Sequence, residues 1–135
     1  MKNILKFSFV LLFITFCSLG LKAQPHFTVN WESDCDYQTT SAKYLVTWYL
    51  VYLPTSDIVA NGISPQLDYL ATFYQASIDD WDCDKDDYPL NYKAFAIVQR
   101  FEGTTLTCTG QRLSGAKRCS ELYDGFSFTV QMSAP

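Results

Sequence analysis

The sequence has a single histidine and few basic residues, and these two shortages narrow the range of possible functions. His26 is the one histidine in 135 residues. Catalysis by a serine or cysteine nucleophile needs a base beside the nucleophile, so we expect no Ser–His or Cys–His pair. The basic residues are scattered, and no cluster of them is larger than Lys117-Arg118. A phosphate backbone needs several clustered cations, so we expect no nucleic-acid binding.

The sequence also lacks an apolar run long enough to cross a membrane as a helix, which takes about 20 residues. The run Phe7–Phe16 follows Lys2 and Lys6 and precedes Leu21-Lys22-Ala23. This order predicts a secretory signal peptide over residues 1–23, cleaved before Gln24. A lipoprotein would be anchored at Cys17, but the bulky Phe16 stands where a small residue is expected, so we do not adopt that interpretation.

Internal repeats and low-complexity linkers are absent as well, so residues 24–135 are expected to form one domain. Loss of the signal peptide removes three lysines. Seven Lys and Arg then stand against 14 Asp and Glu, which gives a formal charge of −7. The expected product is an acidic, secreted or periplasmic protein with no transmembrane segment after cleavage.

The four cysteines of residues 24–135 contain no C-x₂-C pair, so we do not expect a four-thiolate zinc site. An even number of cysteines in an exported domain predicts two disulfides instead. Cys108 and Cys119 flank a polar, glycine-containing segment typical of a hairpin loop, so we pair them with each other. Cys35 then pairs with Cys83.

Residues present in unusual density define the fold. Tyr44–Leu53 contains no charge, and its β-branched and aromatic residues favour a strand. Both of its alternating faces are mostly apolar, which predicts a central strand covered on both sides. Other strands are expected from alternation or turn signals at 27–31, 58–60, 92–101, 104–109 and 126–132.

The segment Ser64–Ile78 fits two structures. Ser64 before Pro65 is a good helix start, and Leu67, Leu70, Ala71, Tyr74 and Ile78 share one helical face, which favours a short helix over about 65–78. As a strand, odd-numbered apolar residues from Leu67 to Phe73 would share a face. The Asn61-Gly62 dipeptide before it is a strong turn signal.

Short alternating strands separated by turn signals predict a mainly β protein, an antiparallel sandwich of two sheets. Cys35 lies 13 residues before Trp48, and Asp87 precedes Tyr92 in a corner-like segment. In these residues the chain resembles immunoglobulin-like domains, over about half of its mature length. The second inter-sheet cysteine of that pattern would fall at position 94, which is alanine. The resemblance therefore concerns architecture alone and implies no function.

The loop Asp79–Asp87 concentrates six carboxylates in nine residues. Oxygen ligands suit Ca²⁺, and Asp80, Asp82 and Asp84 match the first three ligand positions of a calcium loop. Lys85 stands where the loop needs glycine, and Asn91 stands where a glutamate would close the cage. A solvated acidic loop held by Cys83 is the other interpretation.

Two aromatic residues near these carboxylates are candidates for binding a sugar or a partner protein. Trp81 lies among aspartates and either folds back onto the core or stays exposed beside Tyr88. A pair of aspartates from the same loop would in principle serve a small hydrolase. The sequence gives no separation between carboxylates to support that chemistry.

From the sequence we expect an exported, non-enzymatic binding or accessory protein whose partner is another envelope or extracellular protein. A Ca²⁺-dependent module that binds carbohydrate through the Asp79–Asp87 loop is the alternative. A small hydrolase with paired aspartates is the third hypothesis.

Overall fold

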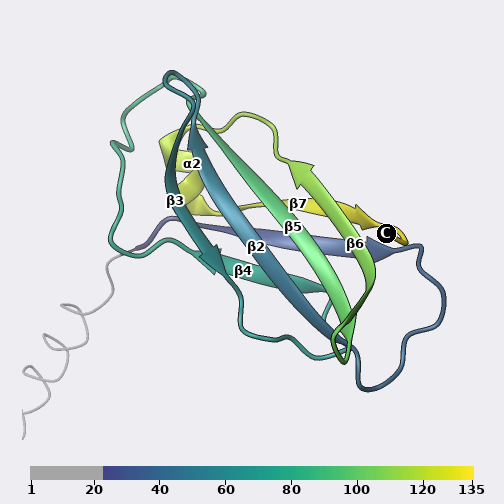
Figure 1. Cartoon of the computed structure of the whole chain (residues 1–135). Coiled ribbons are helices and arrows are strands. Elements are labelled where there is room, and N and C mark those ends of the chain that lie inside the picture. The colour runs from purple at the N-terminus through teal and green to yellow at the C-terminus, as the bar shows by residue number, and fades with distance from the viewer. Residues whose placement is uncertain (1–22) are drawn as a thin grey trace, which may run out of the picture.

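The computed structural model describes residues 23–135, which fold into two β-sheets packed face to face (Figure 1). A three-stranded sheet has the order β4-β1-β7, and a four-stranded sheet has the order β3-β2-β5-β6. The elements along the chain are β1 (His26–Ser33), β2 (Lys43–Tyr52), β3 (Asp57–Ile63), β4 (Phe73–Ser77), β5 (Tyr92–Glu102), β6 (Thr105–Leu113), α2 (Cys119–Asp124) and β7 (Phe126–Met132).

The predicted signal peptide and Cys17 lie outside the described residues, apart from Ala23. Among residues 23–135, no helix has the length and apolar character needed to span a membrane.

The predicted strand Tyr44–Leu53 is confirmed as β2, which lies in the middle of the four-stranded sheet beside β5. The two strands pair antiparallel from Lys43 opposite Phe101 to Tyr52 opposite Tyr92. The strand period of two sends Tyr44, Val46, Trp48 and Leu50 into the space between the sheets, where each is buried. From β5 the buried residues are Tyr92, Ala94, Ala96, Val98 and Arg100.

The core between the sheets is aromatic on the β1 side. Phe27 meets Trp48 edge to face, with ring centroids 5.5 Å apart, and Trp31 lies 5.3 Å from Tyr44. Aromatic pairs of this kind stabilise beyond their buried area by about 0.5–1.5 kcal/mol each. They fix how β1 lies across β2, so they set the alignment of the two sheets.

The three-stranded sheet is mixed, whereas the sequence predicts antiparallel pairing. β1 pairs antiparallel with β4 but parallel with β7, from Phe27 opposite Phe126 to Ser33 opposite Met132. A parallel neighbour must be joined by a long connection. β1 and β7 meet this requirement, because they are the first and last strands of residues 23–135 and all the other elements of that range lie between them.

The predicted helix over about 65–78 is wrong. Ser64 is buried, and its hydroxyl accepts the Val46 amide at 2.9 Å and donates to the Pro65 carbonyl at 2.8 Å, so it ends β3 and caps no helix. Leu67 then exchanges two backbone hydrogen bonds with Tyr44. The segment then turns at Asp68–Ala71, where the Ala71 amide donates to the Asp68 carbonyl at 2.9 Å, and leads into β4, where Ala76 is the buried residue.

The predicted turn at Asn61-Gly62 is also wrong, because β3 runs through both residues. Gly62 lies opposite Trp48 in the ladder. A Cβ at Gly62 would come within 2.6 Å of the Trp48 ring. This glycine therefore lets a tryptophan lie against the neighbouring strand, and its small size matters more than any turn geometry.

Two disulfides are present as predicted, but the predicted pairing is wrong. Cys35 is bonded to Cys108, and Cys83 is bonded to Cys119. The segment after Cys108 is the second half of β6 and not a hairpin loop. At about 3.3 Å per residue, the five residues that follow Cys108, up to Leu113, carry the chain roughly 16 Å away before it turns towards Cys119.

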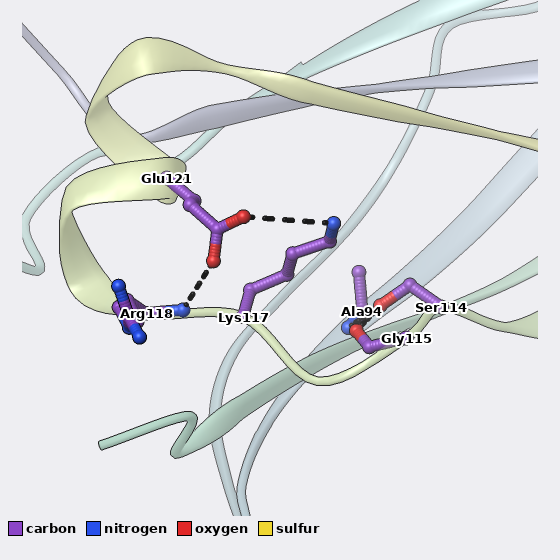
Figure 2. Close-up of polar contacts among 6 residues, drawn as sticks. All are labelled: Ala94, Ser114, Gly115, Lys117, Arg118 and Glu121. Carbon is purple, nitrogen blue, oxygen red and sulfur yellow. Dashed lines mark hydrogen bonds and ion pairs between the residues drawn. The ribbon is translucent and has the colours of Figure 1, made fainter. Parts of the chain in front are cut away.

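The short helix α2, which the sequence analysis missed, begins at Cys119. Figure 2 shows the polar contacts before and within it. Glu121 accepts the Arg118 amide at 2.8 Å and lies 3.8 Å from the Lys117 ammonium. Ser114 accepts the Ala94 amide at 2.9 Å, which ends β6 in the way Ser64 ends β3.

The disulfide pairing gives a direct prediction for tryptic peptides of the unreduced protein. We expect the peptide ending at Lys43 to be linked to 101–112, and 44–85 to be linked to 119–135. Mass spectrometry before and after reduction identifies the linked pairs. Recovery of 101–112 linked to 119–135 would instead support the pairing expected from the sequence and contradict the structure.

The two faces of β2 predict different costs for the same substitution. Leu50→Ala removes a fully buried side chain and should lower the free energy of unfolding by about 2–5 kcal/mol. Leu45→Ala, on the outward face of the same strand, leaves no enclosed cavity and should cost less than half as much. Urea unfolding of both variants measures the difference, and equal losses would contradict the assigned faces.

Candidate functional site

The acidic loop Asp79–Asp87 connects β4 to β5 and is mostly exposed. Its tip is a turn in which Asp84 accepts two amides, that of Asp86 at its carboxylate (2.9 Å) and that of Asp87 at its carbonyl (3.1 Å). The disulfide from Cys83 to Cys119 fastens the loop to α2. The loop is therefore ordered by its own hydrogen bonds and by one covalent link.

The proposed calcium ligands are distributed over different parts of this loop. Asp80 and Asp82 line a hollow of about 250 Å³ beside Gln24, Pro25 and Tyr123, whereas Asp84 does not line it. Within residues 23–135, no three histidine, cysteine or acidic side chains lie close enough together to share a metal ion. Asp80, Asp82 and Asp84 therefore do not converge on one point in this structure.

The two aromatic candidates are used differently. Trp81 folds back: its ring meets Tyr92 edge to face at 5.5 Å and packs against the core. Tyr88 is 79% exposed, and the Arg118 guanidinium lies 5.5 Å from the centre of its ring. Trp81 and Tyr88 line different hollows. The structure does not bring them together as two sides of one binding site.

Among residues 23–135, two ionisable groups have shifted pKa values, and both shifts have structural causes. The pKa of Tyr92 is raised by burial first, and then by the neighbouring Tyr52 and Asp87. The pKa of Glu102 is lowered because its carboxylate accepts the Thr39 amide at 2.8 Å. Tyr92 supports Trp81, and Glu102 holds the loop before β2, so each is explained by packing or a loop contact.

The feature that the sequence analysis did not select is the outward side of the four-stranded sheet, which we call the outer face. Its apolar members come from all four strands: Leu45, Tyr49 and Val51 of β2, Ile58 and Ile63 of β3, Phe95, Ile97 and Phe101 of β5, and Leu106 and Leu113 of β6. In the view of Figure 1, the strands β3, β2, β5 and β6 lie in front, and no other helix or strand among residues 23–135 covers them.

The ladder registers place these side chains in continuous rows across the sheet. One row runs through Asn61, Tyr49, Phe95 and Leu113, and the next runs through Ile63, Thr47, Ile97 and Gln111. The Tyr49 and Phe95 rings stack in the centre, 6.1 Å apart. Towards the edges, Ile63 is 65% exposed and Leu113 is 47% exposed. The side chains at the centre of the outer face therefore pack against one another, while their outward surface stays exposed to solvent.

The charges on the outer face are all of one sign. Lys43 and Lys93 occupy outward positions at opposite ends of the β2–β5 pair. No carboxylate occupies an outward position of the four strands, since Asp57 pairs with Tyr52 and Glu102 pairs with Thr105 on the other side. In an acidic protein, a surface without acids that is bordered by lysines stands apart from the rest of the molecule.

The outward side of the other sheet has a different character. Its side chains include His26, Thr28, Asn30 and Glu32 of β1, Gln75 and Ser77 of β4, and Ser127, Thr129 and Gln131 of β7, with Phe73 as an exposed apolar residue. This alternation of apolar and polar residues is what a solvated sheet face shows. The comparison identifies the outer face of the four-stranded sheet as the unusual surface.

One end of the outer face is hollowed. A hollow of about 550 Å³ lies where Leu45 and Phe101 meet Lys43, Gln66 and the turn at Gly103-Thr104. Lys43 lies 4.0 Å from Asp68, which is more than half exposed. The hollow has an apolar floor and has Lys43 at its rim, so it makes this end of the outer face concave.

Comparison of the chain with protein-family models, with curated proteins and with solved structures found no match.

The sequence did contain the signal for the outer face. Both sides of Tyr44–Leu53 are apolar, and Phe95, Ile97 and Phe101 share one side of the next long strand. The sequence analysis expected a covering layer for that side, and the structure supplies none within residues 23–135.

Proposed function

We propose that the mature chain is an exported, non-enzymatic protein that binds another protein of the envelope or extracellular space through the outer face. The observation that carries this proposal is the uncovered apolar and aromatic surface across all four strands of one sheet. Contiguous exposed apolar patches on a soluble chain mark interaction surfaces. The two lysines at its ends favour a partner whose rim is acidic.

The form of the surface favours a protein over a small ligand. The Tyr49–Phe95 stack lies at the centre of the face, Leu113 and Ile63 lie near its edges, and polar side chains such as Gln111 and Asn61 surround them. Protein interfaces share this arrangement of aromatic centre and polar rim. Apart from the hollow at its Lys43 end, the face is an open sheet surface, whereas small-molecule sites are usually concave and enclose the ligand.

The predicted signal peptide and the disulfides support export. Disulfides persist in oxidising compartments such as the periplasm and the extracellular space. Both bonds join distant parts of the chain, with sequence separations of 73 and 36 residues. These two disulfides are consistent with a protein that acts in a secreted or periplasmic setting.

The other hypotheses have less support. The positions of Asp80, Asp82 and Asp84 do not favour a preformed calcium site, and no geometry favours the paired-aspartate hydrolase. The immunoglobulin-like interpretation is supported by the buried Trp48 and by Tyr92 at the start of β5. It is weakened by the bond from Cys35 to Cys108, because the matching cysteine position is Ala94. It therefore remains a proposal about architecture.

A variant with a disrupted outer face tests the proposed function. Phe95→Ser with Leu113→Glu removes one central ring and places a carboxylate on a surface that has none. We expect affinity capture from the native exported fraction to recover a stoichiometric partner with the wild-type chain. Capture by the double variant should fall by at least about tenfold, which corresponds to about 1.4 kcal/mol of binding free energy.

Phe73→Glu is the matched control, because Phe73 is 60% exposed on the outward side of the other sheet. It should capture the partner as well as the wild type does. Thermal melting verifies that each variant is folded. Equal capture by the wild type and the double variant would contradict the proposal. Recovery of a second copy of this chain as the sole partner would do the same.

A further inference from the structure

The two sheets are joined along one side of the sandwich and separated along the other. On the joined side, Thr109 of β6 and Ser133 after β7 exchange two backbone hydrogen bonds of 2.9 Å, and Arg112 donates to the Thr129 carbonyl at 2.8 Å. Gly110 belongs to this contact, since a Cβ there would collide with the Gln131 carbonyl oxygen. On the other side, a hollow of about 420 Å³ lies between the edge strands β3 and β4.

The edge of β3 presents unused backbone groups to this hollow. Just past the last ladder pair, Thr47 and Ile63, the Ser64 amide donates to the Val46 carbonyl at 2.8 Å, so Val46 and Ser64 stand at a hydrogen-bonded position of the antiparallel pattern. Hydrogen-bonded and non-hydrogen-bonded pairs alternate. The amide and carbonyl groups of Asn61 and Ile63 therefore point away from β2, towards the free edge. The five consecutive residues Val59–Ile63 line the hollow.

Neither strand beside the hollow carries a lysine or a proline, and residues 78–81 lie across the hollow from β3. Natural proteins block free edges with lysine, proline or a covering segment. β3 contains no lysine, arginine or proline, and its one charge is Asp57 at its start. β4 has no charged residue and no proline. Two edge strands without lysine or proline on the same open side of the sandwich are compatible with pairing to an added strand.

The walls of the hollow define the chemistry of such a strand. Trp48, Tyr74, Ile78 and Trp81 supply apolar and aromatic surface. Asp79 and Asp80 supply two carboxylates, and none of the residues that line the hollow is basic. A segment that fits would present apolar side chains inwards and a cation near the two aspartates.

We propose that the hollow between β3 and β4 binds an extended peptide of another protein, which pairs with β3 as a fifth strand of the four-stranded sheet and carries a lysine or arginine against Asp79 and Asp80. Binding by strand addition draws affinity from main-chain hydrogen bonds and specificity from side-chain pockets. This site adjoins the outer face and shares Asn61 and Ile63 with its β3 edge, but the proposal does not depend on the partner of that face.

The charge of the hollow argues against a second copy of this chain as the occupant. Edge-to-edge pairing of two copies would bring β3 or β4 of one molecule against β3 of the other. Neither strand carries a basic residue to meet Asp79 and Asp80, and Asp57 would add a further carboxylate. An extended segment of another protein that carries a lysine or arginine would supply the cation that a second copy lacks.

A displayed library of random twelve-residue peptides, selected on the mature protein, tests this inference. We expect the selected peptides to share alternating β-branched or aromatic residues and a lysine or arginine. Asn61→Pro removes an outward amide of β3 without touching the β2 ladder, because proline is tolerated where the amide faces solvent. Synthetic copies of the selected peptides should bind this variant at least about tenfold more weakly than the wild type, as measured by fluorescence anisotropy.

Three controls make the result specific. Asn61→Ala keeps the backbone amide, so this variant should bind the selected peptides with an affinity within about twofold of the wild type. A difference of that size is usual for a surface substitution. Asp79→Asn with Asp80→Asn should weaken the basic peptides and reduce the salt dependence of binding. The outer-face variant Phe95→Ser with Leu113→Glu should bind them unchanged, which separates this site from the proposed function.

Several results would overturn the inference. It fails if no peptide is enriched, or if the enriched peptides bind Asn61→Pro as well as they bind Asn61→Ala. Concentration-dependent dimers of the wild type that Asn61→Pro abolishes would show that the occupant is a second copy. Hydrogen exchange at Asn61 and Ile63 gives an independent measurement, because their amides should slow when peptide binds and remain fast when the hollow is not used.

Discussion

The pairing of β2 with β5 is the interaction on which the rest of the structure depends. Ten pairs join the two strands, from Lys43 opposite Phe101 to Tyr52 opposite Tyr92, in the middle of the larger sheet. The period of two then decides the position of every side chain on them. One set, which includes Trp48 and Leu50, packs on β1 and forms the core. The other set is also apolar, and the same geometry leaves it on the outside.

Each remaining surface follows from what packs against this pair of strands. β6 continues the sheet from β5 to the closed side, where its residues meet β7, and β3 continues it from β2 to the open side. The disulfides fasten the connections and leave the sheet surfaces free, since Cys35 and Cys83 both lie in loops between strands. The result is a disulfide-linked scaffold of two sheets with an apolar sheet face and an unpaired strand edge. We propose that both features serve binding.

The local pattern of alternating, β-branched and aromatic residues predicted most strands well, because these features can be read within a short stretch of sequence. Phe126–Met132 has its predicted bounds, and Tyr44–Leu53 differs from β2 by one residue at each end. The failures arise where distant residues decide. Ser64 was expected to start a helix, but its hydroxyl bonds the Val46 amide of another strand. The disulfide pairing depends on the length of β6, and the outer face depends on whether a third layer exists. Neither is visible in a local window.

The central claim is that the outer face meets another protein, and a photo-crosslinking side chain at its centre tests this most directly. Benzoylphenylalanine in place of Tyr49 in the native host, with illumination of intact cells, should give one discrete adduct that contains a different protein. The same group in place of Thr28, on the polar face of the other sheet, should give no such adduct. An absence of adducts at Tyr49, or the same adducts from both positions, would contradict the claim.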